Sequence, residues 1–421
     1  MYRKLILDNG VRLVTERIPT VKSVTVGIWV NVGSRDEGPA QAGYSHFIEH
    51  MFFKGTTTRS ATDISREIDA LGGEMNAFTT HESTTFYVKV LDQHLPEALD
   101  LLSDLFLRSC LGQKEIEKEK QVVLEEIRMV QDDPEELVQE LHTKLIMGRH
   151  PLSRPILGRD VTISHITRPA LTAYIETYYR PEEIVVAVAG NFDQSRLERT
   201  MARIFGRYRP PRVGEMRNRM PPEHCSGVTV KQKPLEQVQL CLGLQGVAAG
   251  HPDRYAVYAL NSVLGGSVSS RLFQEVREKR GLSYAIYSFL TGYTDGGTVT
   301  VYAASRAREV ERVLDVIDRE IRKLAKSGIE RDELKRTKDQ MKGSLMLSLE
   351  SSHSRMNKLA KDELLSGRHT SLEEMLAEVD AVSQPQVHRV AQDLFRGDKI
   401  AVTALGPLSS RQVTALNARF S

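Results

Sequence analysis

Alternating apolar and polar residues open the chain and predict an antiparallel hairpin. The runs 4–7 and 11–14 flank an Asn-Gly pair, which is a strong signal for a tight turn between two paired strands. Longer runs rich in β-branched residues, 24–32 and 75–91, predict further strands. The first part of the chain is therefore expected to build a sheet.

Apolar residues at helical spacing follow these strands. Ser60 begins a Ser-x-x-Asp pattern that is typical of a helix start. Apolar residues then recur every three or four positions over 95–109 and 114–130, and a strand-like run lies at 183–191. Strands followed by a series of helices favour an α+β fold, in which the helices pack on an antiparallel-rich sheet.

The order of elements starts again in the second half of the chain. A strand, three helices and a final strand are predicted at 298–303, 307–327, 332–347, 356–365 and 399–405. They repeat the order of the strand at 84–90 and the elements after it. We therefore predict two tandem copies of one unit, each of about 200 residues.

A proline- and arginine-rich segment separates the two copies. Residues 206–227 carry four prolines and five arginines and show no periodic apolar pattern, which is typical of a solvated linker. We expect an N-terminal domain at 1–206, a linker at 207–227 and a C-terminal domain at 228–421.

Composition excludes several classes of protein. The 57 Lys and Arg residues against 55 Asp and Glu leave a net charge of +2, which gives no electrostatic reason to expect a nucleic-acid or anionic-membrane partner. No run approaches the roughly 18 apolar residues of a membrane span, and no apolar signal segment opens the chain, so we expect a cytoplasmic protein. Three cysteines without CxxC spacing argue against a disulfide framework or a cysteine metal site.

One short motif carries metal chemistry. His46 and His50 are four residues apart, so on a helix both imidazoles lie on one face and offer two nitrogen ligands to one metal ion. Glu49 lies beside this pair, where a carboxylate can take a proton from a metal-bound water. The order His-x-x-Glu-His inverts the commoner zinc-protease motif. A helix with two unrelated histidines is the alternative interpretation of the motif taken alone.

The predicted helix at 114–130 supplies a third metal ligand, which a catalytic zinc site requires. Glu119 and Glu126 lie two turns apart on one face of this helix, and Glu126 follows His50 by 76 residues. The neighbouring Glu125 points about 100° away from Glu126, so only one of the two can face the same site.

These residues resemble peptidase family M16, the pitrilysin and insulysin-like metallopeptidases. The resemblance is greatest to the M16B branch, which includes bacterial processing proteases and the mitochondrial processing peptidase. The family pattern is HxxEH followed by a distant glutamate, and His46, Glu49, His50 and Glu126 match it position by position. The resemblance covers essentially the whole chain. It implies an M16/LuxS-like metallohydrolase fold and a zinc metalloendopeptidase with one Zn2+ per chain.

The resemblance also implies how substrate is held. Glu119 matches the family's second glutamate, which supports the metal ligands from behind. The segment Asn76-Ala77-Phe78-Thr79 is similar to the family's edge strand, to which the substrate backbone pairs. Strand addition reads the backbone and so accepts many sequences. Unfolded peptides or targeting-type peptides are therefore the expected substrates.

Two further pairs of residues are assigned by resemblance. Arg277 and Tyr284 match the arginine and tyrosine that hold substrate across the family's chamber; Tyr284 would donate to the oxyanion and Arg277 would hold a substrate carbonyl. Glu136 and Glu140 match acidic positions that contact an arginine near the cleavage site in the mitochondrial enzyme. They imply a preference for basic peptides, and a solvated acidic turn is the alternative interpretation.

The mechanism implied by these residues is metal-assisted hydrolysis. Zinc held by His46, His50 and Glu126 would polarise the scissile carbonyl and acidify a water molecule. Glu49 would accept the proton and pass it to the leaving amine.

The internal repeat offers an independent check on this interpretation. Alignment of the copies puts Tyr258, Asn261 and Ser262 near the places of His46, Glu49 and His50, with Thr337 and Ser344 opposite Glu119 and Glu126. The second copy therefore keeps the scaffold and lacks the zinc ligands. A purely structural role for HxxEH would not predict this asymmetry.

The assembly expected from the resemblance is a clamshell homodimer, in which Arg277 and Tyr284 of one chain approach the zinc of its partner. The rival hypothesis is a catalytically silent or partner-dependent M16-like subunit that binds peptides or scaffolds a complex. Such relatives have usually lost part of the zinc constellation, whereas this chain keeps all of it.

Overall fold

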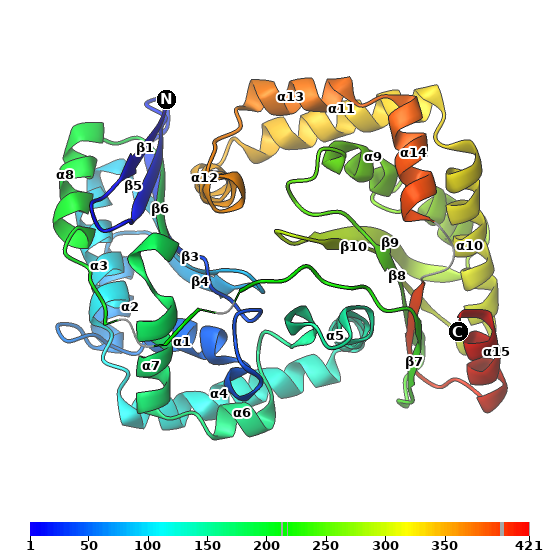
Figure 1. Ribbon diagram of the computed structural model, residues 1–421, viewed down its shortest axis with the longest axis horizontal. Coiled ribbons are helices and arrows are strands. Elements are labelled where there is room, and N and C mark those ends of the chain that lie inside the picture. Colours follow the sequence, from blue (N-terminus) through cyan, green and yellow to red (C-terminus); the bar gives the residue numbers. More distant parts are fainter. Residues whose placement is uncertain (212–213, 217, 396–399, 421) are drawn as a thin grey trace. The chain divides into compact units, whose positions relative to one another are not determined.

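The chain folds into two compact units, seen in the computed structural model of Figure 1, which describes residues 1–211, 214–216, 218–395 and 400–420. Unit 1 consists of Met1–Met129, Arg154–Arg219 and Leu347–Thr370; unit 2 consists of Val130–Ser153, Met220–Met346 and Ser371–Ser421. Parts of the predicted linker (212, 213 and 217) and the predicted start of the last strand, Lys399, lie outside the described residues.

Unit 1 is built on a six-stranded sheet in the order β1-β2-β6-β3-β5-β4. Only β2 and β6 run parallel to each other, and the other neighbours are antiparallel. The strands are β1 (Tyr2–Ile6), β2 (Arg12–Arg17), β3 (Ser23–Val30), β4 (Glu74–Thr79), β5 (Thr84–Leu91) and β6 (Ile184–Gly190). The predicted hairpin is confirmed by the pairing of β1 with β2.

The run 75–91 forms two strands rather than the single strand that its composition predicts. Thr80 donates its backbone N–H to the Ser83 carbonyl at 2.8 Å and closes a tight turn between β4 and β5. The sequence signal was weak because the turn residues, Thr-His-Glu-Ser, include neither glycine nor proline.

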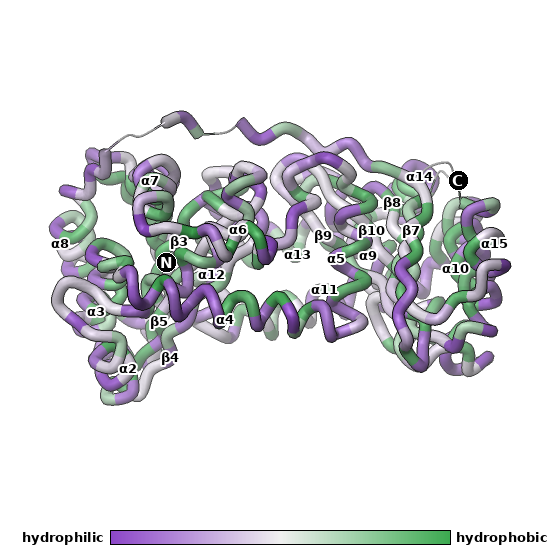
Figure 2. The backbone as a smooth tube through the Cα atoms, turned by 90° about the horizontal axis from the view of Figure 1, so that it is seen from below, coloured by the Kyte–Doolittle hydropathy of each residue, from purple (hydrophilic) through white to green (hydrophobic). Residues whose placement is uncertain are grey.

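Helices cover both faces of this sheet. They are α1 (Tyr44–Phe52), α2 (Ala61–Ala70), α3 (Leu95–Arg108), α4 (Gln113–Asp132), α6 (Asp160–Ser164), α7 (Arg168–Tyr178), α8 (Gln194–Phe205) and α12 (Ser352–Ser366). The predicted start of α2 is confirmed, because the Ser60 hydroxyl accepts from the Asp63 N–H in a capping box. Hydrophilic and hydrophobic residues alternate in bands along α4 (Figure 2), as a helix with one buried face requires.

Unit 2 repeats the plan of unit 1. Its five-stranded sheet has the order β7-β11-β8-β10-β9, with one parallel pair, β7 and β11. The strands are β7 (Gly227–Lys231), β8 (Val238–Gln245), β9 (Ser283–Gly292), β10 (Gly297–Ser305) and β11 (Ala401–Leu405). The order matches β2-β6-β3-β5-β4 strand for strand, so the predicted duplication and the α+β class are both confirmed.

The helices of unit 2 also follow the order of the first copy. They are α5 (Pro134–Met147), α9 (Arg254–Leu264), α10 (Val310–Ser327), α11 (Arg331–Ser348), α13 (Leu372–Ala381), α14 (Gln384–Leu394) and α15 (Ser410–Phe420), with a π-helical turn at Phe273–Glu278. Short 3-10 turns lie at Pro39–Gln41, Asp92–His94, Pro151–Ser153, Pro181–Glu183 and Ala307–Glu309. Among the described residues, no helix combines the length and hydrophobicity that a membrane crossing requires.

The two units exchange one helix each, so that they differ from the contiguous halves of the sequence. Helix α12 comes from the second copy and covers one face of the unit 1 sheet, where Trp29 Nε1 donates to Met356 Sδ at 3.3 Å. Gly27 lies beneath this helix, where a Cβ atom would overlap the Met356 side chain. Helix α5 comes from the first copy and packs in unit 2, with Leu137 and Val138 in one apolar cluster with its strands.

The contact between α12 and the unit 1 sheet predicts a large cost for truncating Met356. Its side chain is fully buried, so Met356→Ala is expected to lower the free energy of unfolding by about 2–5 kcal/mol. Trp29 is the only tryptophan of the chain, so its fluorescence during urea unfolding reports on this unit. The control Met346→Ala, at a half-exposed position, should shift stability by at most about 0.5 kcal/mol. Equal urea midpoints for the two variants would contradict the packing.

A second prediction concerns His142 of α5, which is buried in unit 2. Its Nδ1 lies 3.1 Å from Thr403 Oγ1, and burial lowers the pKa of His142 to about 4. Below about pH 6.5 this histidine is protonated in the unfolded chain but stays neutral in the folded chain. The free energy of unfolding therefore falls as the pH drops. Between pH 6.5 and 5 the loss is about 2 kcal/mol.

His142→Gln should remove this part of the pH dependence. The measurement is urea unfolding of zinc-free protein at pH 7.5 and pH 5.0, followed by circular dichroism. The variant is expected to lose less stability than the wild type on acidification, and an unchanged difference between the two pH values would contradict the assignment.

Candidate active site

Helix α1 carries the His-x-x-Glu-His motif on a helix that is otherwise part of the core. Phe47, Ile48, Met51 and Phe52 are buried against the sheet and its neighbouring helices. The motif residues occupy the remaining side of the helix, facing α4 and β4. This arrangement fixes the position of α1 through apolar packing and leaves its polar side for chemistry.

The start of α1 is held by a carboxylate that sequence patterns did not indicate. The helix begins after Gly43, whose φ of 93° requires glycine. Glu37, fully buried, accepts from the backbone N–H groups of Gly43 at 2.8 Å and Ser45 at 2.7 Å. Burial raises the pKa of Glu37 to about 8, against these two hydrogen bonds. The Ser45 hydroxyl lies 2.8 Å from the Tyr174 hydroxyl.

Three of the predicted metal ligands converge. Glu126 Oε2 lies 3.7 Å from His46 Nε2 and 3.7 Å from His50 Nε2, and the three ligand atoms lie within 4.8 Å of one another. Two atoms that are each about 2.1 Å from a tetrahedral zinc ion are about 3.4 Å apart. Two imidazoles and one carboxylate at this spacing therefore fit a zinc ion.

Glu119 holds His50 from behind. Its Oε1 lies 2.7 Å from His50 Nδ1, which leaves Nε2 facing the metal position. Lys54 reaches the other oxygen of Glu119 at 2.8 Å. Burial alone would raise the pKa of Glu119, but the hydrogen bonds from His50 and Lys54 lower it below its usual value. The carboxylate thus stays charged and fixes the orientation of the ring.

The two histidines differ in their surroundings. Burial lowers the pKa of His46 to about 3, and the neighbouring His50 adds to the shift. Burial opposes the protonation of His50 as well, but the hydrogen bond to Glu119 and the charge of Glu126 raise the pKa of His50. His46 Nδ1 is buried and has no hydrogen-bond partner among the described residues. His46 is therefore neutral, which is the form that binds a metal ion.

Glu49 is tied to the edge strand of the sheet. The Thr79 hydroxyl donates to Glu49 Oε2 at 2.6 Å. Burial raises the pKa of Glu49, although the hydrogen bond from Thr79 and the charge of His50 oppose the shift. The sequence had assigned Thr79 to substrate binding alone.

The predicted substrate segment Asn76–Thr79 lies in β4, at the edge of the unit 1 sheet. The outward backbone N–H of Ala77 is covered by Asn76 Oδ1 at 2.8 Å, and the Phe78 ring packs edge-on against Trp29 at 5.4 Å. Among the described residues β4 pairs with no strand other than β5, so its outer edge is open to strand addition.

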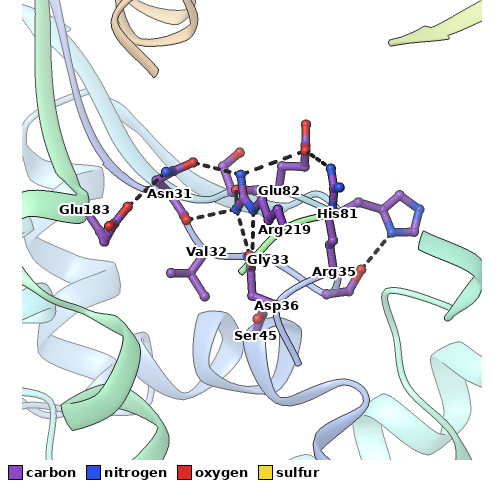
Figure 3. Close-up of polar contacts among 12 residues, drawn as sticks. Asn31, Val32, Gly33, Arg35, Asp36, Ser45, His81, Glu82, Glu183 and Arg219 are labelled. Atoms are coloured by element: carbon purple, nitrogen blue, oxygen red, sulfur yellow. Dashed lines mark hydrogen bonds and ion pairs between the residues drawn. The ribbon is translucent and has the colours of Figure 1, made fainter. Parts of the chain in front are cut away.

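The turn that ends β4 is anchored by a network of charged residues, drawn in Figure 3. Arg219, from the segment after α8, donates to both oxygens of Asp36 and to the Glu82 carbonyl. Arg35 pairs with the Glu82 carboxylate at 2.6 Å. His81 Nδ1 lies 2.8 Å from the Ser34 hydroxyl.

Arg277 and Tyr284 lie together in unit 2. The guanidinium carbon of Arg277 lies 4.2 Å from the centroid of the Tyr284 ring, and Tyr284 is 75% exposed. Arg277 belongs to the π-helical turn, a feature that is frequent at functional sites, and Tyr284 to β9, the edge strand of its sheet. Glu136 and Glu140 are exposed on α5 of the same unit. The approach of these four residues to a zinc ion stays a prediction.

The second copy has the same scaffold without the ligands. Helix α9 takes the place of α1 and carries Tyr258, Asn261 and Ser262, and α11 takes the place of α4. Ser262 Oγ lies 3.3 Å from Gln340 Oε1 across these two helices. The structure describes no second cluster of potential metal ligands in the mapped part of the chain.

Two family profiles match the chain. The profile described as insulinase, peptidase family M16, matches residues 12–160, and the profile of the peptidase M16 inactive domain matches residues 165–341. A solved protease from Helicobacter pylori is 23% identical and has a TM-score of 0.88 over 97% of this chain and 99% of its own. A peptidase M16 inactive domain from Pseudomonas fluorescens is 21% identical and has a TM-score of 0.89, over 97% and 98%.

Relatives with higher identity carry the name of zinc proteases. An uncharacterized zinc protease of Bacillus subtilis is 43% identical over 398 residues, which are 94% of this chain and 97% of the relative. One of Streptomyces coelicolor is 39% identical over 421 residues, 99% of this chain and 92% of the relative. On the strength of this similarity along nearly its whole length, the chain belongs to peptidase family M16.

Proposed function

We propose that the chain is a zinc metalloendopeptidase that cleaves unfolded peptides. The observation that carries this proposal is the convergence of His46, His50 and Glu126, with Glu49 next to them on α1 and free strand edge β4 alongside. When bound by these three residues, zinc supplies Lewis acidity, which makes a water molecule more acidic and polarises a carbonyl group.

Residues of the chain carry out the proton transfer and hold the metal ligands in place. Glu49 acts as general base, since its carboxylate accepts the proton of the attacking water and then delivers it to the leaving amine. Its carboxylate is half-buried beside β4, where the Thr79 hydroxyl holds one of its oxygens. Glu119 keeps His50 in one orientation throughout.

Substrate binding is proposed to occur by strand addition to β4. The backbone groups of Ala77 and Thr79 face the open edge of the sheet, next to the Glu49 carboxylate. A peptide must be extended to pair there, so folded proteins would be poor substrates. Main-chain pairing tolerates many sequences, and preference would come from side-chain contacts.

The second unit is proposed to complete the site in a homodimer. The stacked pair of Arg277 and Tyr284 presents a guanidinium and a phenolic hydroxyl on an exposed surface. These groups suit a substrate carbonyl and a developing oxyanion. Glu136 and Glu140 are proposed to favour basic residues in the peptide, because they are exposed carboxylates on one face of α5.

Glu49→Gln tests the proposed reaction directly. The amide keeps the shape of the side chain but cannot accept the water proton, so hydrolysis of a quenched, unfolded basic peptide should fall by about 100- to 10,000-fold. Zinc content should stay at one ion per chain. If the zinc-loaded wild-type dimer does not cut, a peptide-binding or partner-dependent subunit becomes the better explanation.

Glu119→Gln tests the support of the metal site. The variant loses the charge that orients His50, and zinc affinity should fall by about 10- to 100-fold in a competition with a chelator. Glu125→Gln on the same helix is the matched control, because Glu125 is exposed and pairs with Arg128. Equal zinc affinities for the two variants would show that Glu119 does not support the site.

A further inference from the structure

The hydroxyl of Thr79 makes a short contact with the proposed base. The 2.6 Å distance from Oγ1 to Glu49 Oε2 is typical of a hydrogen bond from a hydroxyl to a charged carboxylate. Two elements far apart in the sequence meet in this bond, because Thr79 ends strand β4 and Glu49 lies on α1.

The pleat of β4 sets the direction of the Thr79 side chain. Met75 and Ala77 pack into the core cluster that contains α1, whereas Phe78 packs on the opposite face with Trp29. Side chains alternate along a strand, so Thr79 shares the α1 face with Met75 and Ala77.

The same residue also presents its backbone to the open edge. Thr80 N–H bonds to Ser83 in the turn, so its backbone points to β5. Neighbouring residues of an antiparallel strand point their backbone groups in opposite directions, so the N–H and carbonyl of Thr79 point outward. The contact of the Ala77 N–H with the Asn76 side chain agrees with this alternation.

We propose that Thr79 is a positioning residue that couples strand addition to the placement of the base. Its hydroxyl holds Oε2 of Glu49 and leaves Oε1 for the water proton. A peptide that pairs with the Thr79 backbone fixes β4, and through this hydrogen bond it also fixes the carboxylate. The hydroxyl donates without losing its proton, so Thr79 takes no part in proton transfer. The coupling rests on the proposed peptidase function.

Thr79→Val and Thr79→Ser separate this role from a structural one. Valine keeps the branched shape and the strand but lacks the hydroxyl, whereas serine keeps the hydroxyl. With a quenched unfolded peptide, Thr79→Val should lower kcat by about 10- to 100-fold with KM and zinc content within about twofold of wild type. Thr79→Ser should recover most of kcat.

Thr85→Val is the matched control on the adjacent strand. Thr85 pairs with Phe78, is fully buried, and its hydroxyl has no hydrogen-bond partner among the described residues. This variant should keep the wild-type kcat. A wild-type kcat in Thr79→Val, or a change in KM alone, would overturn the proposal.

A structural measurement keeps the proposal testable if the wild-type protein cleaves no peptide. Crystal structures of Thr79→Val and Thr85→Val, both loaded with zinc, would show the Glu49 side chain. We expect Glu49 to leave its wild-type rotamer, or to occupy more than one, only in Thr79→Val. An unmoved Glu49 in that variant refutes the positioning role, whereas absent hydrolysis by the wild type refutes the peptidase function.

Discussion

The burial of polar side chains on α1 is the constraint on which the site depends. A helix that contributes five side chains to the core also carries two imidazoles and a carboxylate, and each buried polar group costs free energy unless it finds a partner. Glu37 supplies the partner at the start of the helix, Glu119 for His50, and Thr79 for Glu49. His46 Nδ1 is buried and has no hydrogen-bond partner among the described residues.

Two of these partners, Glu119 and Thr79, come from elements that are remote in sequence, and this separates what the sequence predicts from what it leaves open. The spacing of His46 and His50 predicts two ligands because helical periodicity is local, and Glu126 was assigned by its match to the family pattern. Glu37 and Lys54 had no comparable signal: Glu37 lies six residues before Gly43, outside the capping-box spacing, and a lysine after a helix has many ordinary roles. The role of Lys54 appears only once α4 brings Glu119 beside the end of α1. The role of Glu37 appears only once the loop before α1 folds onto its first turn.

The fold, like the site, was predictable where its sequence signals are local. Hairpin, strands and helices followed from patterns, and the repeated order of elements identified the duplication. The exchange of α5 and α12 could not be predicted from these patterns, because the apolar face of a helix does not indicate which sheet it covers. The turn at 80–83 was missed as well, since it contains neither glycine nor proline. It is closed by hydrogen bonds between Thr80 and Ser83 and anchored by Arg219 and Arg35 through Glu82.

The exchanged helices also bear on how such a chain arose. A single copy of the unit could not cover its own sheet, because the helix that follows its second long helix packs on the sheet of the other copy. Two identical single-copy chains would satisfy both sheets only as a domain-swapped dimer, each lending one helix to the other. Fusion of the two genes would turn that swap into an intramolecular one.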